Sequence, residues 1–165
     1  MNFLIVDGNS IINRSFYAIK SLTNSRGQDV NGVYGFINIF IKHLCAIKPE
    51  YVAVAFDVSR KTFRTELFKE YKGTRKATKE NLINQIKILQ ELLELAGYPV
   101  LKFTNFEADD IIGTLTSKFA SPELKFSILT GDRDSFQLIN SNVCVYLPTN
   151  KSNKSVTNII AEADV

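Results

Sequence analysis

The stretch FLIVDGNS (residues 3–10) joins four apolar residues directly to an aspartate, a glycine and two small polar residues. FLIV (3–6) is typical of a short buried strand, and the residues after it offer turn and helix N-cap chemistry. A strand that leads straight into a helix is the unit from which parallel α/β sheets are built. We therefore expect an α/β fold whose first strand lies at residues 3–6.

The same alternation continues along the chain. Gly97 is expected to end the third helix, because glycine is common just after a helix. VTNIIAEADV (156–165) is interpreted as the start of a further helix after a polar loop at 149–155. The pattern predicts an open, mainly parallel twisted sheet flanked by helices. The other expected strands lie at 51–56, 99–103, 125–130 and 143–147, and the expected helices lie at 10–19, 32–47, 81–97 and from 106 onward.

Length and composition favour a single domain. The chain has 165 residues, of which 45% are hydrophobic and 22% charged. It lacks the run of about 18 apolar residues that spans a membrane. Its start also lacks the features of a signal peptide, so we expect a cytoplasmic protein.

Cys45 and Cys144 lie in apolar runs without metal-ligand spacing, and are interpreted as reduced core cysteines.

Acidic residues follow three of the expected strands. Asp7 follows the first strand, Asp57 the second, and Asp132 and Asp134 the fourth. In an open parallel sheet these strand ends lie at one edge, where ligands bind. Each residue alone has an ordinary explanation, since an aspartate after a strand is often a helix N-cap or a turn residue. Their recurrence after three strands favours a shared site.

FEADDIIGTL (106–115) adds Glu107, Asp109 and Asp110 at the start of an expected helix. Glu107 and Asp110 are three residues apart and share a helix face. Complementing the helix dipole explains this cluster alone equally well. If the helix starts at the same sheet edge, seven carboxylates crowd together and need cations. Because all-oxygen ligand sets favour Mg²⁺ or Mn²⁺, the sequence predicts a divalent metal site.

Residues for several other chemistries are missing from the sequence. His43 is the one histidine, and its place in an apolar helix indicates a structural or merely exposed residue. There is neither a P-loop nor a glycine-rich dinucleotide motif. Without a histidine base, a metal-activated water is the natural nucleophile.

The segment from Arg60 to Glu80 holds eight basic residues against three acidic ones, although the whole chain carries a net charge of only +3. Phe63, Phe68 and Tyr71 are interleaved with these charges, a pattern that favours binding of unpaired bases. A solvated helix face explains the segment alone at least as well. Beside a metal centre, however, it favours an anionic substrate such as a phosphodiester.

Six stretches, in order along nearly the whole chain, match a known family. With them the sequence resembles the 5′-nuclease domain of bacterial DNA polymerase I, within the flap endonuclease superfamily, and matches the N-terminal part of that domain. The resemblance implies a PIN-like, 5′-nuclease fold. The stretches are LIVDGNS (4–10), VNGVYGF (30–36), VAVAFD (52–57), TFRTELFKEYKGTRK (62–76), FEADDIIGTL (106–115) and LTGDRDSFQL (129–138).

The resemblance implies a structure-specific 5′→3′ exonuclease and flap endonuclease that removes RNA primers and displaced 5′ strands in DNA replication and repair. It implies two divalent ions, Mg²⁺ or Mn²⁺. Around the first ion, the matching ligands are Asp7, Asp57, Glu107 and Asp109, with Asp110 as an additional acid. Toward the second ion they are Asp132 and Asp134. The residues expected to act in catalysis are Lys72, Arg75, Asp7 and Asp132, of which Lys72 and Arg75 match a basic pair that contacts the scissile phosphate.

The resemblance also implies a helical arch at about residues 59–81, through which a single-stranded 5′ end passes. The expected partner is DNA with a 5′ flap or single-stranded 5′ end, including RNA primer–DNA junctions, and no membrane. We expect a monomer, which in the natural protein can be fused to a polymerase domain. The expected DNA-binding residues are Arg14, Tyr34, Arg60, Arg64, Lys69, Lys72, Arg75 and Lys76.

The family has further elements that would follow Val165. These are two more aspartates and a helix–hairpin–helix-like element that binds duplex DNA. We therefore expect residues 1–165 to be the N-terminal catalytic part of a 5′-nuclease domain, without its C-terminal duplex-binding helical part. A catalytically deficient DNA-binding fragment and a PIN-type ribonuclease are the alternatives. The long basic segment argues against the ribonuclease, because such enzymes usually lack an arch.

Overall fold

The computed structural model describes residues 1–58, 79–151 and 154–164. In this part of the chain, six strands form one sheet in the order β3-β2-β1-β4-β5-β6. Strands β1 to β5 are parallel, and β6 pairs antiparallel with β5. The open, mainly parallel sheet is therefore confirmed. Its strands are β1 (Asn2–Asp7), β2 (Tyr51–Ala55), β3 (Val100–Leu101), β4 (Lys125–Leu129), β5 (Val143–Lys151) and β6 (Lys154–Ile160).

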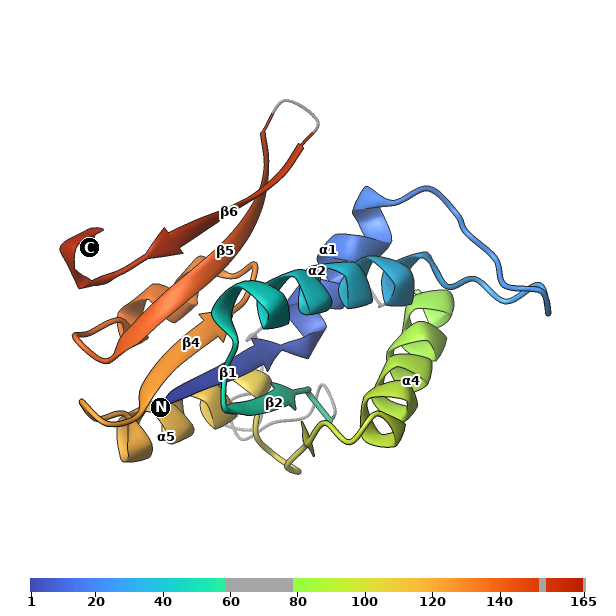
Figure 1. Cartoon of the computed structure of the whole chain (residues 1–165). Coiled ribbons are helices and arrows are strands. Elements are labelled where there is room, and N and C mark those ends of the chain that lie inside the picture. The colour runs from blue at the N-terminus through green and yellow to red at the C-terminus, as the bar shows by residue number, and fades with distance from the viewer. Residues whose placement is uncertain (59–78, 152–153, 165) are drawn as a thin grey trace, which may run out of the picture.

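Helices cover both faces of the sheet (Figure 1). One face packs against α1 (Gly8–Ala18), α2 (Asn31–Ile47) and α4 (Glu80–Leu95), and the other face packs against α5 (Ala108–Phe119). Two short 3-10 helices, η1 (Arg133–Leu138) and η2 (Glu162–Asp164), follow β4 and β6. None of the helices in the described ranges is long and apolar enough to cross a lipid bilayer.

The central strand β1 explains this layered arrangement. Successive side chains of a strand point to opposite faces. Accordingly, Leu4 and Val6 pack with the α1, α2 and α4 layer, whereas Ile5 packs with the α5 layer. All three side chains are fully buried. A strand that is apolar on both faces requires cover on both faces, which is the usual state of a parallel sheet.

Two glycines are required by the geometry. Gly97 has a φ of 82° and its N–H donates to the Glu94 carbonyl at 3.0 Å, so it ends α4 as predicted. Gly8 lies against the ring of Phe56, and a Cβ at this position would be only 2.5 Å from the ring. The first turn of α1 can therefore approach the end of β2 only with glycine at position 8.

A buried amide network joins three helices. Gln85 of α4 is fully buried, and its Oε1 accepts hydrogen bonds from the backbone N–H groups of Gly32 and Val33 at 2.7 and 3.3 Å. Its Nε2 donates to Asn31 Oδ1 at 2.9 Å. The Nδ2 of Asn31 in turn donates to two carbonyls near the end of α1, at 2.9 and 3.1 Å. Since no side chain at the N-cap position caps α2, Gln85 supplies its cap from another helix.

The C-terminal segment differs from the prediction. Most of the expected helix at 156–165 is the strand β6, and the expected loop at 149–155 partly extends β5 and β6. The β-branched residues of VTNII favour a strand, and β6 pairs with β5 from Val145↔Ile160 to Lys151↔Lys154. Within the described residues, helical structure in this segment is limited to η2.

Of the two roles that the sequence left open for His43, structural or merely exposed, the structure shows the first. It is buried on α2, where its Nδ1 donates to the Ile39 carbonyl at 2.6 Å and its Nε2 lies 3.1 Å from Thr157 Oγ1 of β6. Burial lowers the pKa of His43, so the neutral ring ties α2 to β6. Both cysteines are free, as predicted. Cys45, however, is exposed on α2, so the prediction that it belongs to the core was wrong.

Candidate active site

The carboxyl ends of β1, β2 and β4 meet at one edge of the sheet. Strand β1 lies between β2 and β4, and its last residue, Asp7, is in register with Ala55 at the end of β2. The chain builds the sheet outward from β1 in both directions, so β1 and β4 flank the topological switch point where such sheets bind ligands. Asp57 and Asp132 follow β2 and β4 at this same edge.

Asp7 is a buried carboxyl group with two hydrogen bonds. Its Oδ1 accepts from the Ser10 backbone N–H and its Oδ2 from the Thr130 hydroxyl, each at 2.9 Å. Burial raises the pKa of Asp7 from 3.8 to about 7, and the charges of Asp109 and Asp57 contribute to this rise, whereas the two hydrogen bonds oppose it. A carboxylate held in this way favours a cation beside it.

Asn9 and Ser10 fasten the neighbouring loops to the start of α1. Asn9 Oδ1 accepts a hydrogen bond from the Asp57 backbone N–H at 3.1 Å, and Ser10 Oγ accepts one from Gly131 N–H at 2.9 Å. The loops after β2 and β4 are thereby held against the loop after β1. Sequence reasoning treated Asn9 and Ser10 only as turn and cap residues and missed both roles. The signal was present, because small polar side chains directly after a central strand can reach the adjacent strand ends.

The start of α5 lies beside Asp57, whose Oδ1 accepts the Ala108 backbone N–H at 2.7 Å. Glu107 is buried and forms a reciprocal capping box with Asp110, whose Oδ2 accepts from the Glu107 N–H at 2.9 Å. Asp109 is exposed, and its charge reaches Asp7. The cluster therefore lies both at the N-terminus of α5, where the sequence left open a role in complementing the helix dipole, and at the sheet edge.

Thr130 connects the loop after β4 to Asp7. The hydroxyl group of Thr130 donates a hydrogen bond to Asp7, and the same hydroxyl oxygen accepts one from the Asp132 N–H at 3.0 Å. Asp132 Oδ1 accepts from the Asp134 N–H at 3.0 Å and caps η1. Asp132 and Asp134 are thus joined to Asp7 through a buried threonine that sequence analysis did not single out.

The donor groups at this edge fit a divalent cation by their chemistry. They are carboxylate and hydroxyl oxygens, the hard ligands that Mg²⁺ and Mn²⁺ prefer. Among the described residues, no three His, Cys, Asp or Glu side chains already form a cluster that could hold a metal ion. Asp7, Asp57 and Asp110 instead accept hydrogen bonds from backbone amides. A cation would relieve the repulsion that contributes to the raised pKa of Asp7.

Two of the candidate DNA-binding residues can be placed. Arg14 is half-buried on α1, and Tyr34 is 55% exposed in the first turn of α2. Most of the expected arch lies outside the described residues, and α4 begins at Glu80 within its expected C-terminal end. The candidate residues that also lie outside the described residues are Arg60, Arg64, Lys69, Lys72, Arg75 and Lys76.

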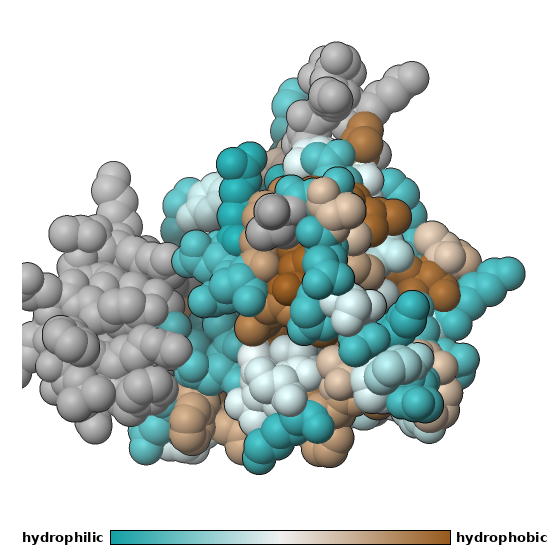
Figure 2. Space-filling model, turned by 90° about the vertical axis from the view of Figure 1, so that its left-hand side faces the viewer, coloured by the Kyte–Doolittle hydropathy of each residue, from teal (hydrophilic) through white to brown (hydrophobic). Residues whose placement is uncertain are grey.

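An open depression of about 610 Å³ lies at the opposite edge of the sheet, where the strands begin. Asn2, Phe126 and Val143 line it together with residues of η2. Figure 2 shows this side of the molecule, where apolar patches alternate with hydrophilic side chains. None of the candidate residues that the structure describes lines the depression, so it is separate from the carboxylate edge.

The sequence matches a protein family described as "5'-3' exonuclease, N-terminal resolvase-like domain" over residues 2–165. DNA polymerase I of Caldicellulosiruptor bescii is 41% identical over 165 residues, which are 100% of this chain and 19% of that protein. The 5'-3' exonuclease of Aquifex aeolicus is 38% identical over 146 residues, which are 88% of this chain and 50% of that protein. The chain thus spans at most half the length of these relatives.

Solved structures with the same fold include the T5 D15 protein co-crystallised with metal ions. It matches with a TM-score of 0.70 at 19% identity, covering 89% of this chain and 55% of that chain. The catalytic core of Rad2 in complex with DNA substrate matches with a TM-score of 0.55 at 16% identity, covering 98% of this chain and 48% of that chain. At these identities the likeness concerns the arrangement of sheet and helices.

Proposed function

Because the chain belongs to the family of 5′-3′ exonuclease N-terminal resolvase-like domains, we propose that it hydrolyses DNA phosphodiester bonds near a single-stranded 5′ end or 5′ flap. Two named relatives support this proposal, the 5'-3' exonuclease and the DNA polymerase I described above. The T5 D15 protein with metal ions and the Rad2 core with DNA substrate support a metal-dependent reaction on DNA.

The observation that carries the proposal is the environment of Asp7. This carboxyl group is 5% exposed and lies at the switch point of the sheet. Its pKa is raised to about 7, by burial first and then by the charges of Asp109 and Asp57. A fold that only needed an N-cap for α1 could use serine or asparagine here without that cost. A buried acid coupled to two other acids is characteristic of a functional site.

A divalent cation, Mg²⁺ or Mn²⁺, is part of the proposal. When bound, it would lower the pKa of a water molecule and offset charge on the reacting phosphate. The proposed ligands of a first ion are Asp7, Asp57, Glu107 and Asp109, with Asp110 as an additional acid, and those toward a second ion are Asp132 and Asp134.

The chain's own residues have distinct tasks in this proposal. Asn9, Ser10 and Thr130 hold the three loops so that the carboxylates keep their relative positions. Lys72 and Arg75 stabilise the negative charge that develops on the phosphate. The remaining candidates hold the DNA strand through its phosphates and bases, and they are Arg14, Tyr34, Arg60, Arg64, Lys69 and Lys76.

We extend the proposal to the organisation of the chain. Residues 1–165 form the N-terminal catalytic part of the nuclease domain, and residues of about 59–81 guide the 5′ end. The substrates are displaced 5′ strands and RNA primer–DNA junctions in replication and repair. The chain acts as a monomer or as one part of a longer polymerase.

A cleavage assay tests the proposal. The chain is incubated with 5′-labelled flap DNA in Mn²⁺ or Mg²⁺, and separately in EDTA. Asp7→Asn is the test variant, and Glu91→Gln, an exposed carboxylate of α4, is the matched control. We expect cleavage near the junction of single and double strand that is lost in EDTA and in Asp7→Asn and kept in Glu91→Gln.

Other outcomes would contradict the proposal in distinguishable ways. Equal cleavage by Asp7→Asn would remove the central residue from the site. Cleavage of single-stranded RNA in preference to flap DNA would indicate a PIN-type ribonuclease. Flap binding without cleavage by a folded chain in either metal would indicate the DNA-binding fragment, with catalysis dependent on parts of the relatives that this chain does not match.

A further inference from the structure

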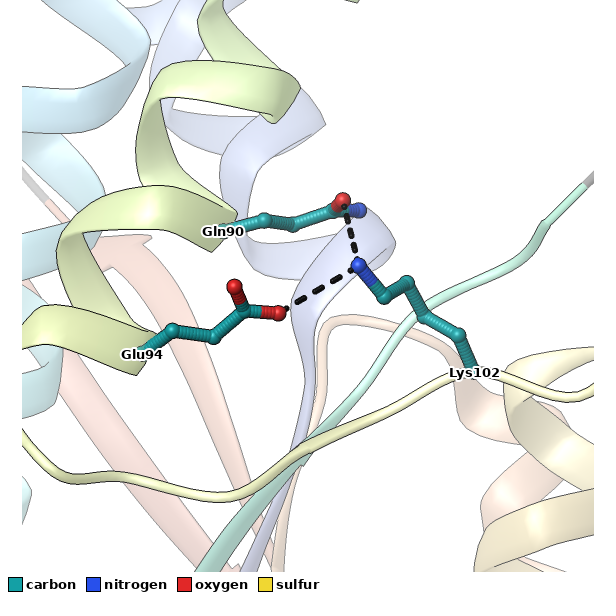
Figure 3. Close-up of polar contacts among 3 residues, drawn as sticks. All are labelled: Gln90, Glu94 and Lys102. Atoms are coloured by element: carbon teal, nitrogen blue, oxygen red, sulfur yellow. Dashed lines mark hydrogen bonds and ion pairs between the residues drawn. The ribbon is translucent and has the colours of Figure 1, made fainter.

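The turn at residues 102–107 connects β3 to α5 and is anchored at both ends. At its start, Lys102 Nζ donates to Gln90 Oε1 at 3.3 Å and lies 3.4 Å from Glu94 Oε1, both on α4 (Figure 3). At its end, Glu107 and Asp110 form the capping box of α5. The turn therefore runs from the α4 layer to the carboxylate edge, and it is held to α4 at its start and to α5 at its end.

This turn exposes two large aromatic rings. Phe103 is 55% exposed and Phe106 is 50% exposed. The Phe106 N–H donates to the Phe103 carbonyl at 3.3 Å, and Asn105 between them has a φ of 70°. A tight backbone turn thus sets the spacing of the two rings. Single exposed apolar residues are ordinary on protein surfaces, but here two phenylalanines share one short turn.

The position of the rings indicates what they contact. Phe106 directly precedes Glu107, and Asp109, which is coupled to Asp7, is three residues further on. A strand held at the carboxylate edge through its phosphates would have unpaired bases within reach of this turn. Aromatic rings stack on every base regardless of sequence, because every base has a π-face.

We propose that Phe103 and Phe106 form a stacking platform for unpaired nucleobases of a DNA strand bound at the carboxylate edge. The proposal rests on the proposed nuclease function and adds a base-contacting surface outside the residues predicted from the sequence. The platform contributes to affinity for single-stranded DNA next to a duplex. It takes no part in breaking the phosphodiester bond.

The test uses a 5′-flap duplex whose single strand carries 2-aminopurine, a base analogue whose fluorescence is quenched by stacking. Binding is measured with Ca²⁺ in place of Mg²⁺ to slow cleavage. The test variant is the double substitution Phe103→Ala with Phe106→Ala. The matched control is Phe119→Ala, because Phe119 is also 55% exposed but ends α5 at the far end from the carboxylates. Urea melts establish that each variant is folded.

We expect the double alanine variant to lose quenching at one or two flap positions. Its Kd should rise about 5-fold to 150-fold, which corresponds to one stacked base. Phe119→Ala should match the unsubstituted chain. Replacing both residues by leucine separates stacking from general apolar contact. Stacking predicts that the leucine pair also loses quenching and affinity.

Unchanged quenching and affinity in the double alanine variant would overturn the platform. So would a leucine pair that binds as tightly as phenylalanine, since this would identify an apolar docking surface rather than a stacking surface. Cleavage of the same flap in Mg²⁺ keeps the two proposals apart. If the unsubstituted chain cleaves the flap and the variant with both phenylalanines replaced by alanine binds it normally, only the platform fails. If it neither binds nor cleaves the flap, the proposed function fails and the platform fails with it.

Discussion

The burial of Asp7 predicts a pH-dependent loss of stability that one substitution should remove. In the folded chain its pKa is about 7, against an ordinary value of 3.8. Between these pH values the folded state keeps a proton that the unfolded state has released, so stability falls as the pH rises. The loss should begin near pH 4 and be complete just above pH 7 in the metal-free protein.

Its magnitude follows from the shift. A rise of about three pKa units corresponds to about 4 kcal/mol, at 1.36 kcal/mol per unit. Asp7→Asn cannot ionise and avoids this loss. The substitution also leaves the Thr130 hydroxyl without its carboxylate acceptor, at a cost of about 1 kcal/mol. The variant should therefore be about 1 kcal/mol less stable than the unsubstituted chain near pH 4 and about 3 kcal/mol more stable near pH 8.

Urea denaturation in EDTA across this pH range measures the difference between the two proteins. Far-UV circular dichroism is the suitable signal, because the chain has no tryptophan. The other titrating groups largely cancel in the difference, so a change of sign between about pH 4 and pH 8 isolates Asp7. A difference that does not vary with pH would show that Asp7 ionises normally, and the reasoning from burial would be refuted. Mg²⁺ at pH 8 should stabilise the unsubstituted chain but not the variant.

Three further predictions, on Gly8, Gln85 and His43, test the packing of the fold. Gly8→Ala should lower the free energy of unfolding, measured in urea melts, by about 1–3 kcal/mol, because the added Cβ overpacks the contact with Phe56. Gly113→Ala is the control: its Cβ would lie 3.7 Å from its nearest neighbour, so it should be neutral or slightly stabilising. Gln85→Leu should cost about 3 kcal/mol and speed amide hydrogen exchange at the start of α2, because two buried N–H groups lose their acceptor. Burial lowers the pKa of His43. The neutral, buried ring should therefore stabilise the fold fully above pH 6.5, and this stabilisation should be lost as the pH falls below that value. His43→Gln should remove that part of the acid sensitivity in melts at different pH.

The layered sheet could be predicted because its pattern is local. FLIV and YVAVAF are apolar on both faces and are each followed by an aspartate, and a parallel sheet covered on both sides is the arrangement that buries such runs. The same reasoning predicted the end of α4 at Gly97, where a left-handed residue is needed. Strand β6 was missed because VTNII is short, and its pairing with β5 is set by residues on another segment.

The long-range hydrogen bonds of the site and of the helix layer could not be predicted in the same way. Thr130 and Asp7 are 123 residues apart in the chain, and Gln85 and Gly32 are 53 apart. Threonine and glutamine are ordinary residues at the end of a strand and on a helix, so nothing in the local pattern marks them. Their roles appear only when the fold brings the partners together. The acidic residues were noticed because repeated negative charge beside apolar residues is itself unusual.

The stretch DGNS shows why fold and site depend on the same residues. Asp7 caps α1 and carries the raised pKa, Gly8 permits the approach to Phe56, and Asn9 and Ser10 bind the loops after β2 and β4. The contacts of Gly8, Asn9 and Ser10 hold the strand ends close together. This closeness buries Asp7 beside other acids, so its ionised form is unfavourable. Stability gained from the loops thus offsets the cost at one carboxylate. A bound cation would reverse that cost, so metal binding and folding should stabilise each other through Asp7.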